Sequence, residues 1–331
     1  MIHLSRRAAL ARTCAALVAP ILLLPACGDA TQSADAAGSG GDTRNDRPRI
    51  ALVMKTLDNP FFAEMARGAA TAERDTGVNL SIAAARSETS IDQQIAIVGN
   101  FIDEKVAAIV IAPSDSVKLV PALVAAKAAG IKVVNLDNRL DPEFARQSGL
   151  GTVPFIGIDN VRAAHAAAHA LSADLGTPAE AAIIEGIRNA ANNQARKLGA
   201  IKGFAENANV RLVASESANW LRDEAASTTR SILAAYPGLK LLFCANDMMA
   251  LGALDTLARL ERTDVVVAGF DNIPEVEPAL RSGRLAVTVD QRAAEMGRKG
   301  VEAALNLIRG QAVPAETIIE TRVVTSRELR R

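Results

Sequence analysis

The sequence has no excess of charge of either sign and is poor in aromatic residues, cysteine and histidine. Its 331 residues carry 37 Lys+Arg against 37 Asp+Glu, with 3% aromatics, 3 Cys and 3 His. A balanced charge excludes the strongly basic surface that binding to nucleic-acid phosphates requires, so we expect no nucleic-acid partner. A hydrophobic fraction of 49% excludes a largely disordered chain, and the length predicts two folded domains.

Signatures of catalysis, cofactors and metals are also missing. No Gly-x-Gly-x-x-Gly follows a predicted strand and no Gly-x4-Gly-Lys-Ser/Thr occurs, which argues against dinucleotides and nucleoside triphosphates. His165 and His169 are spaced i,i+4 without an evident third ligand, so we interpret them as an exposed helix face rather than a metal site. Cys244 lies in an apolar run and is expected to be a buried, inert thiol rather than a nucleophile. We predict no catalytic residue, no cofactor and no metal, hence no enzyme.

Residues 1–26 have the three parts of an export signal. A basic start with three arginines between positions 6 and 12 precedes an apolar run at 14–24 and a small-residue end. The run is shorter than the roughly 20 apolar residues of a membrane-spanning helix. Leu24-Pro25-Ala26-Cys27-Gly28 resembles a bacterial lipobox, which predicts lipidation of Cys27; the alternative is an ordinary secretory signal. Arg6-Arg7 also resembles a twin-arginine signal, so both export routes stay open.

Residues 27–48 predict a flexible tether. They are rich in Gly, Ser, Ala, Thr and Asp and have almost no large apolar residue, so burial cannot offset the entropy of ordering them. Residues 1–26 contain basic residues and no acid, so cleavage would leave a mildly acidic mature chain. We therefore expect an exported, periplasmic protein that is anchored to a membrane through Cys27.

The remainder of the chain alternates short apolar runs with Ala-rich helical stretches. Strands are expected at 50–54, 79–83, 107–111, 132–136, 155–158, 181–184, 211–214, 240–244 and 265–268, and helices at 61–76, 91–104, 116–129, 160–175 and 192–207. Most of the strands are continuously apolar, as parallel strands covered on both faces are. The repeated β-α unit predicts an α/β protein with two doubly wound, Rossmann-like lobes.

Polar and aromatic side chains gather after several of these strands. Ligands of doubly wound sheets bind beyond the carboxyl ends of the strands. The candidates are Asn59, Phe61, Phe62, Asp137, Asn138, Arg139, Arg196, Trp220, Asn246, Asp271 and Gln291. Carboxylate, amide and guanidinium groups match the paired hydroxyls of a sugar, and aromatic rings pack against its C–H faces. Singly, each residue has a plainer reading as a helix cap, a turn residue or core, but their shared position favours a ligand site.

Several segments that contain these residues resemble a known protein family. Ile50 to about Val324 resembles the periplasmic binding proteins of the ribose, allose and galactose class, the substrate receptors of ABC sugar importers. The resemblance rests on Lys55-Thr56-Leu57-Asp58-Asn59-Pro60-Phe61-Phe62, Val134-Asn135-Leu136-Asp137, Ile184-Glu185-Gly186, residues 244–250 and residues 269–275, and is nearest to the allose-binding branch. It implies the type I periplasmic binding protein fold, with parallel sheets, a multi-strand hinge near Val153, Gln291 and Glu316, and a pyranose held between the lobes. The lobes are expected at 49–153 plus 291–315 and at 154–290 plus 316–331.

The resemblance also implies ligand contacts residue by residue. It carries all of the candidates above and adds Lys55, which matches a lysine of allose receptors that ribose receptors lack. Asn138 departs from both branches, because ribose receptors have Arg and allose receptors Glu at this position, and here the cation moves to Arg139. A cyclic polyol such as inositol is therefore an alternative to a pyranose.

The expected partners are a monosaccharide ligand and the ABC permease subunits of the inner membrane, with the protein acting as a monomer. The alternative is a periplasmic sensor that presents a bound sugar or polyol to a chemoreceptor or a sensor kinase. A sugar-responsive repressor shares the two-lobed body, but it needs an N-terminal helix-turn-helix where this chain has an export signal.

Overall fold

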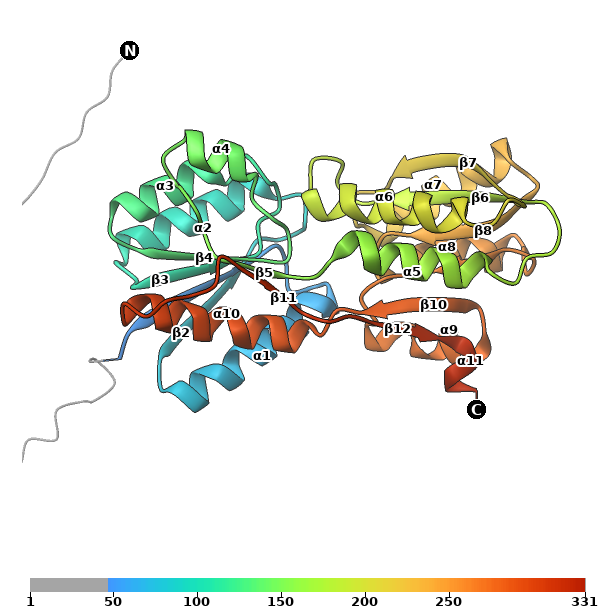
Figure 1. Ribbon diagram of the computed structural model, residues 1–331. Helices are drawn as coiled ribbons and strands as arrows, with labels where there is room; N and C mark the ends of the chain where they lie inside the picture. The colour runs from blue at the N-terminus through green and yellow to red at the C-terminus, as the bar shows by residue number, and fades with distance from the viewer. Residues whose placement is uncertain (1–46, 331) are drawn as a thin grey trace, which may run out of the picture. The chain divides into compact units, whose positions relative to one another are not determined.

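Residues 47–330 of the computed structural model form two six-stranded sheets with helices on both faces of each (Figure 1). The expected export signal, Cys27 and all but the last two residues of the expected tether lie outside the described residues. Within the described part of the chain, every helix is too short or too polar to traverse a bilayer.

The first sheet has the strand order β11-β5-β4-β3-β1-β2 and is parallel throughout. Its strands are β1 (Arg49–Met54), β2 (Asn79–Ala84), β3 (Ala108–Ile111), β4 (Lys132–Leu136), β5 (Phe155–Gly157) and β11 (Glu316–Ile318). In Figure 1, α2 (Ile91–Asp103), α3 (Val120–Ala128) and α4 (Pro142–Gln147) lie on one face, and α1 (Pro60–Thr76) and α10 (Ala293–Ile308) on the other. The central strands β1 and β3 are buried on both faces, which explains their continuous apolar sequences.

The second sheet has the order β12-β10-β9-β8-β6-β7, in which only the β10–β12 pairing is antiparallel. Its strands are β6 (Ala179–Glu185), β7 (Val210–Ser217), β8 (Leu239–Cys244), β9 (Val266–Ala268), β10 (Leu285–Asp290) and β12 (Arg322–Thr325). The helices of this half are α5 (Asn160–Ser172), α6 (Ala191–Ala205), α7 (Arg222–Ala235), α8 (Asp247–Arg259), η1 (Pro274–Val276), α9 (Glu277–Ser282) and α11 (Ser326–Leu329). Helix α5 packs closely on α6, and α7 on α8.

The chain passes between the two sheets three times, after Gly157, after Asp290 and after Ile318. The passage at Gln291 agrees with the expected boundary. The other two boundaries, expected at 153/154 and 315/316, lie a few residues later, because β5 and β11 pair with each other in the first sheet. Strand β11 has three residues and two exposed side chains, so no apolar run marks it in the sequence.

The nine expected strands and five expected helices are present within a few residues of their predicted bounds. The helix expected from residue 116 begins only at Val120. The carboxylate of Asp115 accepts hydrogen bonds from the backbone N–H groups of Val117 and Lys118, both at 2.8 Å, and holds a turn before the helix. Cys244 is buried in β8 as expected, and burial raises the pKa of its thiol.

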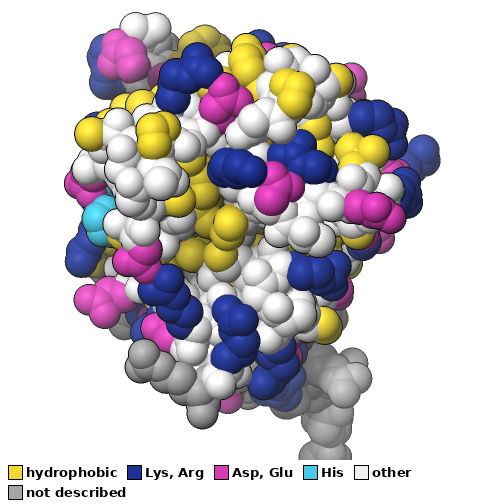
Figure 2. All heavy atoms as spheres, turned by 90° about the vertical axis from the view of Figure 1, so that its right-hand side faces the viewer, with side chains coloured by type: hydrophobic (Ala, Val, Ile, Leu, Met, Phe, Trp, Pro, Cys, Tyr) yellow, Lys and Arg dark blue, Asp and Glu magenta, His cyan; other side chains and the backbone are white. Residues whose placement is uncertain are grey.

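The surface of the second half mixes charges of both signs. Figure 2 shows Lys and Arg side chains interspersed with Asp and Glu around exposed hydrophobic groups. Exposed ion pairs of this half include Lys240–Asp264 at 2.6 Å and Arg222–Asp255 at 2.7 Å. Such pairs contribute at most about 1 kcal/mol each, so the stability of the fold depends mainly on the buried sheets and helices.

Candidate functional site

A small cavity, with about 10 Å³ of free space for a water-sized sphere, lies where the strand ends of the two sheets meet. It is lined by Lys55, Asn59, Phe61, Phe62, Glu88, Asp137, Asn192, Arg196, Trp220, Asn246, Asp271 and Gln291. This free space is about enough for one water molecule, so the side chains fill most of the site. Its lining is aromatic at several positions and otherwise polar or charged, which suits a ligand with apolar faces and a polar rim.

The first half contributes a buried ion pair. Lys55 directly follows β1 and Asp137 directly follows β4, and the Lys55 ammonium lies 2.9 Å from the Asp137 carboxylate. The ammonium is also 5.3 Å from the ring centre of Phe62, within cation–π range. Asp137 has φ = 58°, a left-handed conformation that costs a residue with a side chain on the order of 1–3 kcal/mol. Such strain is typical of residues that a fold holds in place for binding.

Asn59 begins α1 and fixes the orientation of its own amide. Its Oδ1 accepts a hydrogen bond from the Phe61 backbone N–H at 3.0 Å, which caps the helix. Its Nδ2 therefore points the other way and donates to Glu88 Oε1 at 2.9 Å. The cap also places Phe61 and Phe62 at the cavity, where their rings meet edge to face with centres 5.0 Å apart.

Glu88 was not predicted from the sequence. It lies in the loop between β2 and α2, four residues beyond the end of β2, and is buried. Burial raises the pKa of Glu88 to about 7, although Lys55 and the hydrogen bond from Asn59 act in the opposite direction. The available signal was its place beyond the carboxyl end of β2, the strand that pairs with β1.

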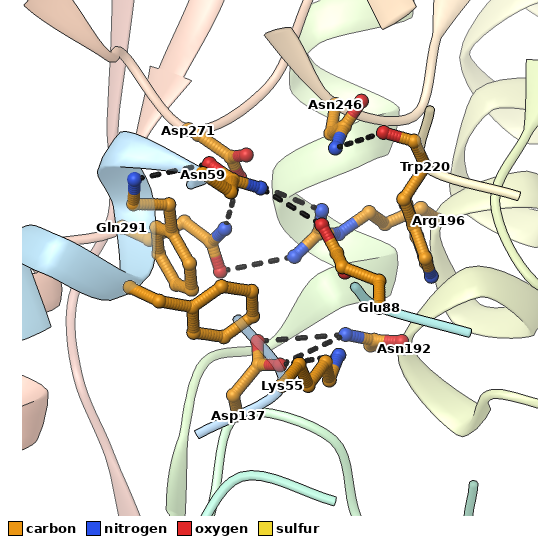
Figure 3. Close-up of a pocket in the computed structure, with 12 residues that line it drawn as sticks. Lys55, Asn59, Glu88, Asp137, Asn192, Arg196, Trp220, Asn246, Asp271 and Gln291 are labelled. Atoms are coloured by element: carbon orange, nitrogen blue, oxygen red, sulfur yellow. Dashed lines mark hydrogen bonds and ion pairs between the residues drawn. The ribbon is translucent and has the colours of Figure 1, made fainter. Parts of the chain in front are cut away.

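The second half contributes Arg196, which α6 points into the cavity. Its guanidinium donates to Asn160 Oδ1 at 2.8 Å, to the Ala245 carbonyl at 2.8 Å and to Gln291 Oε1 at 3.1 Å. It also stacks on Phe270, 4.0 Å from the ring centre, and lies 3.6 Å from the Asp271 carboxylate. Burial lowers the pKa of Arg196, and the Asp271 charge opposes this shift. Figure 3 shows Arg196 and Gln291 joined at the centre of the site.

Asp271 follows β9 in a strained turn. Its φ is 123° and that of Asn272 is 57°. Gln291 Nε2 donates to the Asp271 carboxylate at 2.5 Å, and burial raises the pKa of Asp271 although Arg196 opposes the shift. Behind the turn, the Asp247 carboxylate accepts from the Thr288 hydroxyl at 2.8 Å and from the Ile273 N–H at 3.0 Å. Asp247 thus holds the turn that presents Asp271.

Trp220 is held by close packing and by a cap. A Cβ atom at residue 186 would overlap the Trp220 indole, so only glycine fits there. Asn246 caps α8 through its Oδ1, and its Nδ2 donates to the Trp220 carbonyl at 3.3 Å. Trp220 has φ = 70°, and its buried Nε1–H has no hydrogen-bond partner in residues 47–330. A ligand oxygen can satisfy this donor.

Direct contacts join the two halves beside the cavity. Asn192, which was also not predicted, places its Nδ2 3.4 Å from both carboxylate oxygens of Asp137. The backbone N–H of Asn192 donates to Asn138 Oδ1 at 3.2 Å, and that of Ala191 donates to Ser116 Oγ at 3.1 Å. Figure 3 shows the Asp137 carboxylate joined by dashed lines to both Lys55 and Asn192. The side-chain oxygen of Asn192 is buried without a partner in the described part of the chain, so it can accept from a ligand.

Ten of the twelve residues predicted from the sequence line the cavity; Asn138 and Arg139 do not. Asn138 is buried and bridges the halves, since its amide nitrogen donates to the Pro113 carbonyl at 3.0 Å while its oxygen accepts from Asn192. Arg139 turns away, stacks on Phe155 at 3.9 Å from the ring centre and pairs with Glu316. The left-handed turn at Asp137 explains why the residues that follow it point elsewhere.

Several residue types that are common in enzyme and metal sites are absent from the lining of this cavity. Its twelve lining residues include no Ser, Thr, Cys or His. His165 and His169 lie on α5 and both contact Glu206 at 2.8 Å. Across residues 47–330, no group of three or more His, Cys, Asp or Glu side chains is arranged to hold a metal ion.

Comparison with known proteins places the chain among sugar-binding proteins. The periplasmic binding protein domain family matches residues 50–312. A D-ribose/D-allose-binding protein of Pseudomonas aeruginosa is 38% identical over 283 residues, which cover 84% of this chain and 88% of that protein. The ribose import binding protein of Salmonella typhimurium is 32% identical over 279 residues, covering 83% and 90%.

Solved structures agree with the sequence comparison. An ABC transporter solute-binding protein of Actinobacillus succinogenes with bound D-allose is 35% identical, with a TM-score of 0.81, covering 86% of this chain and 99% of that one. The expected fold class, two doubly wound α/β lobes of the type I periplasmic binding protein fold, is confirmed.

Proposed function

The chain belongs to the periplasmic binding protein domain family, and from this premise we propose that it is the monosaccharide receptor of an ABC importer. One observation carries the proposal. A small buried cavity is lined from both halves by ion-paired carboxylates, Asp137 and Asp271, together with aromatic rings. The two relatives described above are named as a D-ribose/D-allose-binding protein and a ribose import binding protein, and the second name favours transport over the sensory alternative.

The lining residues fit a pyranose. Asp137 and Asp271 accept hydrogen bonds from sugar hydroxyls, while Lys55 donates to sugar oxygens. The rings of Phe62 and Trp220 cover the apolar faces of the ligand. A micromolar Kd corresponds to about −8 kcal/mol, which several charge-assisted hydrogen bonds of roughly 1.5–3 kcal/mol supply after ordering costs. A cyclic polyol with the same arrangement of hydroxyls is the alternative ligand.

Binding is coupled to closure in this proposal. The three passages between the sheets act as the hinge, and the ligand enters while the halves are apart. Because a closed site contacts the ligand from both halves, the ligand shifts the population toward the closed state by its differential affinity for that state. In this proposal the protein binds and releases the sugar without changing it, as expected of a member of a binding-protein family.

The receptor acts in the periplasm and delivers the sugar to permease subunits in the inner membrane. The predicted lipidation of Cys27 would anchor it to a membrane. Metabolic labelling with a fatty acid tests this prediction: the wild-type chain should carry the label, and a Cys27→Ala chain should not.

A thermal-shift screen of the signal-free protein against pentoses, hexoses and polyols tests the proposed function. A ligand that binds only the folded state raises the melting temperature. D-allose or D-ribose should raise it with a concentration dependence that follows binding. If no sugar and no polyol raises it, the proposed function is wrong.

The site assignment makes a separate prediction. Asp137→Ala and Asp271→Ala should each weaken sugar binding by about 2–4 kcal/mol, because each leaves donors of the sugar and of the paired cation without an acceptor. Calorimetry measures the affinity, and circular dichroism checks that the fold is retained. Unchanged affinity in both variants contradicts the assignment.

A further inference from the structure

The buried charges around the cavity do not balance. The carboxyl groups of Glu88, Asp137, Asp247 and Asp271 are buried there, against the two cations of Lys55 and Arg196. Lys55 pairs with Asp137, and Arg196 lies beside Asp271. Glu88 and Asp247 are left without a paired cation. A buried carboxyl group without a compensating charge takes up a proton more readily than it bears an isolated charge.

The two remaining carboxyl groups differ in their hydrogen bonds. Asp247 lies behind the cavity wall and accepts from the Thr288 hydroxyl and the Ile273 N–H, so its oxygens are satisfied by the protein. Glu88 lies in the wall itself and has one protein partner, the amide of Asn59. Glu88 is therefore the acid whose remaining hydrogen bond is available to a ligand.

Asn59 determines which oxygen of Glu88 is available. Its own Oδ1 is occupied by the Phe61 N–H at the start of α1, so its Nδ2 must be the group that donates to Glu88 Oε1. Oε1 is thus an acceptor. The other oxygen, Oε2, has no hydrogen-bond partner within residues 47–330. In a protonated Glu88 the proton belongs on Oε2, where it can be donated to a ligand oxygen.

We propose that Glu88 is a specificity-determining residue that binds the sugar as a neutral carboxylic acid, with Oε2–H donating to a ligand oxygen and Oε1 accepting from Asn59. This inference rests on the proposed function of the same cavity. With Glu88 neutral, the lining carries two cations and two carboxylates, which suits an uncharged sugar or polyol. A sugar acid or a sugar phosphate would bring an unpaired negative charge into the closed site and is excluded.

The groups around Glu88 shift its pKa in both directions. Burial favours the neutral form of Glu88, as do the nearby carboxyl groups of Asp137 and Asp271. Lys55, Arg196 and the hydrogen bond from Asn59 favour its ionised form. Burial dominates and raises the pKa of Glu88 to about 7 from 4.5. If opening the cavity returns Glu88 to water, closure over a sugar takes up a proton between these values. Affinity is then highest at low pH, falls as pH rises toward 7, and levels off above it.

Calorimetric titration of D-allose and D-ribose at pH 5 to 8.5 tests the proposal, with wild type, Glu88→Gln and Glu88→Ala compared. Glutamine keeps an acceptor for Asn59 and places a permanent N–H donor where Oε2–H would be. Glu185→Gln is the matched control, because Glu185 is equally buried and paired with Lys197 and Ser215, but does not line the cavity.

The wild type should lose about tenfold or more in affinity between pH 5.5 and 7.5, as should Glu185→Gln. Glu88→Gln should bind within about threefold of wild type at pH 5.5 and keep that affinity at high pH, while Glu88→Ala should bind roughly 10–100-fold more weakly at pH 5.5. A pH profile that persists in Glu88→Gln, or a Glu88→Gln protein that binds tenfold more weakly at every pH, overturns the proposal and leaves the proposed function standing. If wild type binds neither these sugars nor any polyol, the proposed function itself fails.

Discussion

The two ion pairs of the cavity are built differently. Arg196 is held by hydrogen bonds to Asn160, Ala245 and Gln291 and by the ring of Phe270, and its distance to Asp271 is 3.6 Å. Within residues 47–330, Lys55 has Asp137 as its one acidic partner, at 2.9 Å, and no further hydrogen bond from its ammonium. An ammonium has three N–H donors, so Lys55 keeps donors for a ligand.

The two cations are therefore expected to differ in role: Arg196 stabilises the fold as well as the site, whereas Lys55 contributes mainly to ligand binding. Arg196 satisfies groups that belong to its own half and to the passage at Gln291, so its removal disturbs the fold of the second half as well as the site. Lys55 has fewer protein partners than Arg196, so we expect its removal to act mainly on binding. The cation from the second half is thus held by several protein groups, whereas the cation from the first half has one acidic partner.

The largest effect is expected for Arg196→Met. The substitution leaves the Asp271 carboxylate without its buried cation and the Ala245 carbonyl and Asn160 without their donor. Breaking a buried pair in this way costs about 3–5 kcal/mol of stability. Thermal unfolding should show a clearly lowered melting temperature, and sugar binding should be undetectable. Arg188→Met is the control, because Arg188 is exposed and its contact with Glu216 is long, at 3.4 Å. Equal melting temperatures for the two variants contradict the structural role of Arg196.

Lys55→Met should separate binding from stability. The side chains are similar in length, and the change removes the donors that face the ligand, so affinity should fall about 10–100-fold. The melting temperature of the sugar-free protein should fall less than for Arg196→Met, because few protein groups lose a partner. If Lys55→Met loses as much stability as Arg196→Met and keeps its affinity for the sugar, Lys55 has a structural role and the proposed difference between the two cations is wrong.

The smallest effect is expected for Arg139→Ala. Its guanidinium lies outside the cavity, on Phe155 and against the exposed carboxylate of Glu316. Sugar affinity should change by less than about threefold, since exposed ion pairs contribute at most about 1 kcal/mol. A tenfold loss measured by calorimetry would restore Arg139 to the ligand contacts.

The sequence predicts the order of elements well where burial is complete. Strand β3 is apolar along its whole length, and β1 is apolar after Arg49, because both faces of these strands are covered. Strand β11 was not predicted, because it is a short edge strand with two exposed side chains and so has no apolar run. Two of the three predicted lobe boundaries therefore differ from the sheet membership, because β5 and β11 pair with each other in the first sheet.

The site is predicted where a residue directly follows a strand. Asp137 is the first residue after β4; Lys55, the first residue after β1, was expected only from the family resemblance. Glu88 was not predicted because it lies in a loop several residues after β2 and not directly at the strand end. Asn192 was not predicted because a polar residue at the start of a helix is usually a helix cap. Arg139 was included because composition cannot reveal that the left-handed turn at Asp137 directs the following residue away.

The central claim is that one small ligand is held by both halves, and the fluorescence of Trp220 tests it most directly. Trp220 is the only tryptophan of the chain and lines the cavity from the second half, whereas Asp137 lines it from the first. Titration with D-allose or D-ribose should change the emission saturably in wild type. The midpoint should move to at least about 30-fold higher concentration in Asp137→Ala. Saturation at the same concentration in both proteins would contradict a ligand shared between the halves.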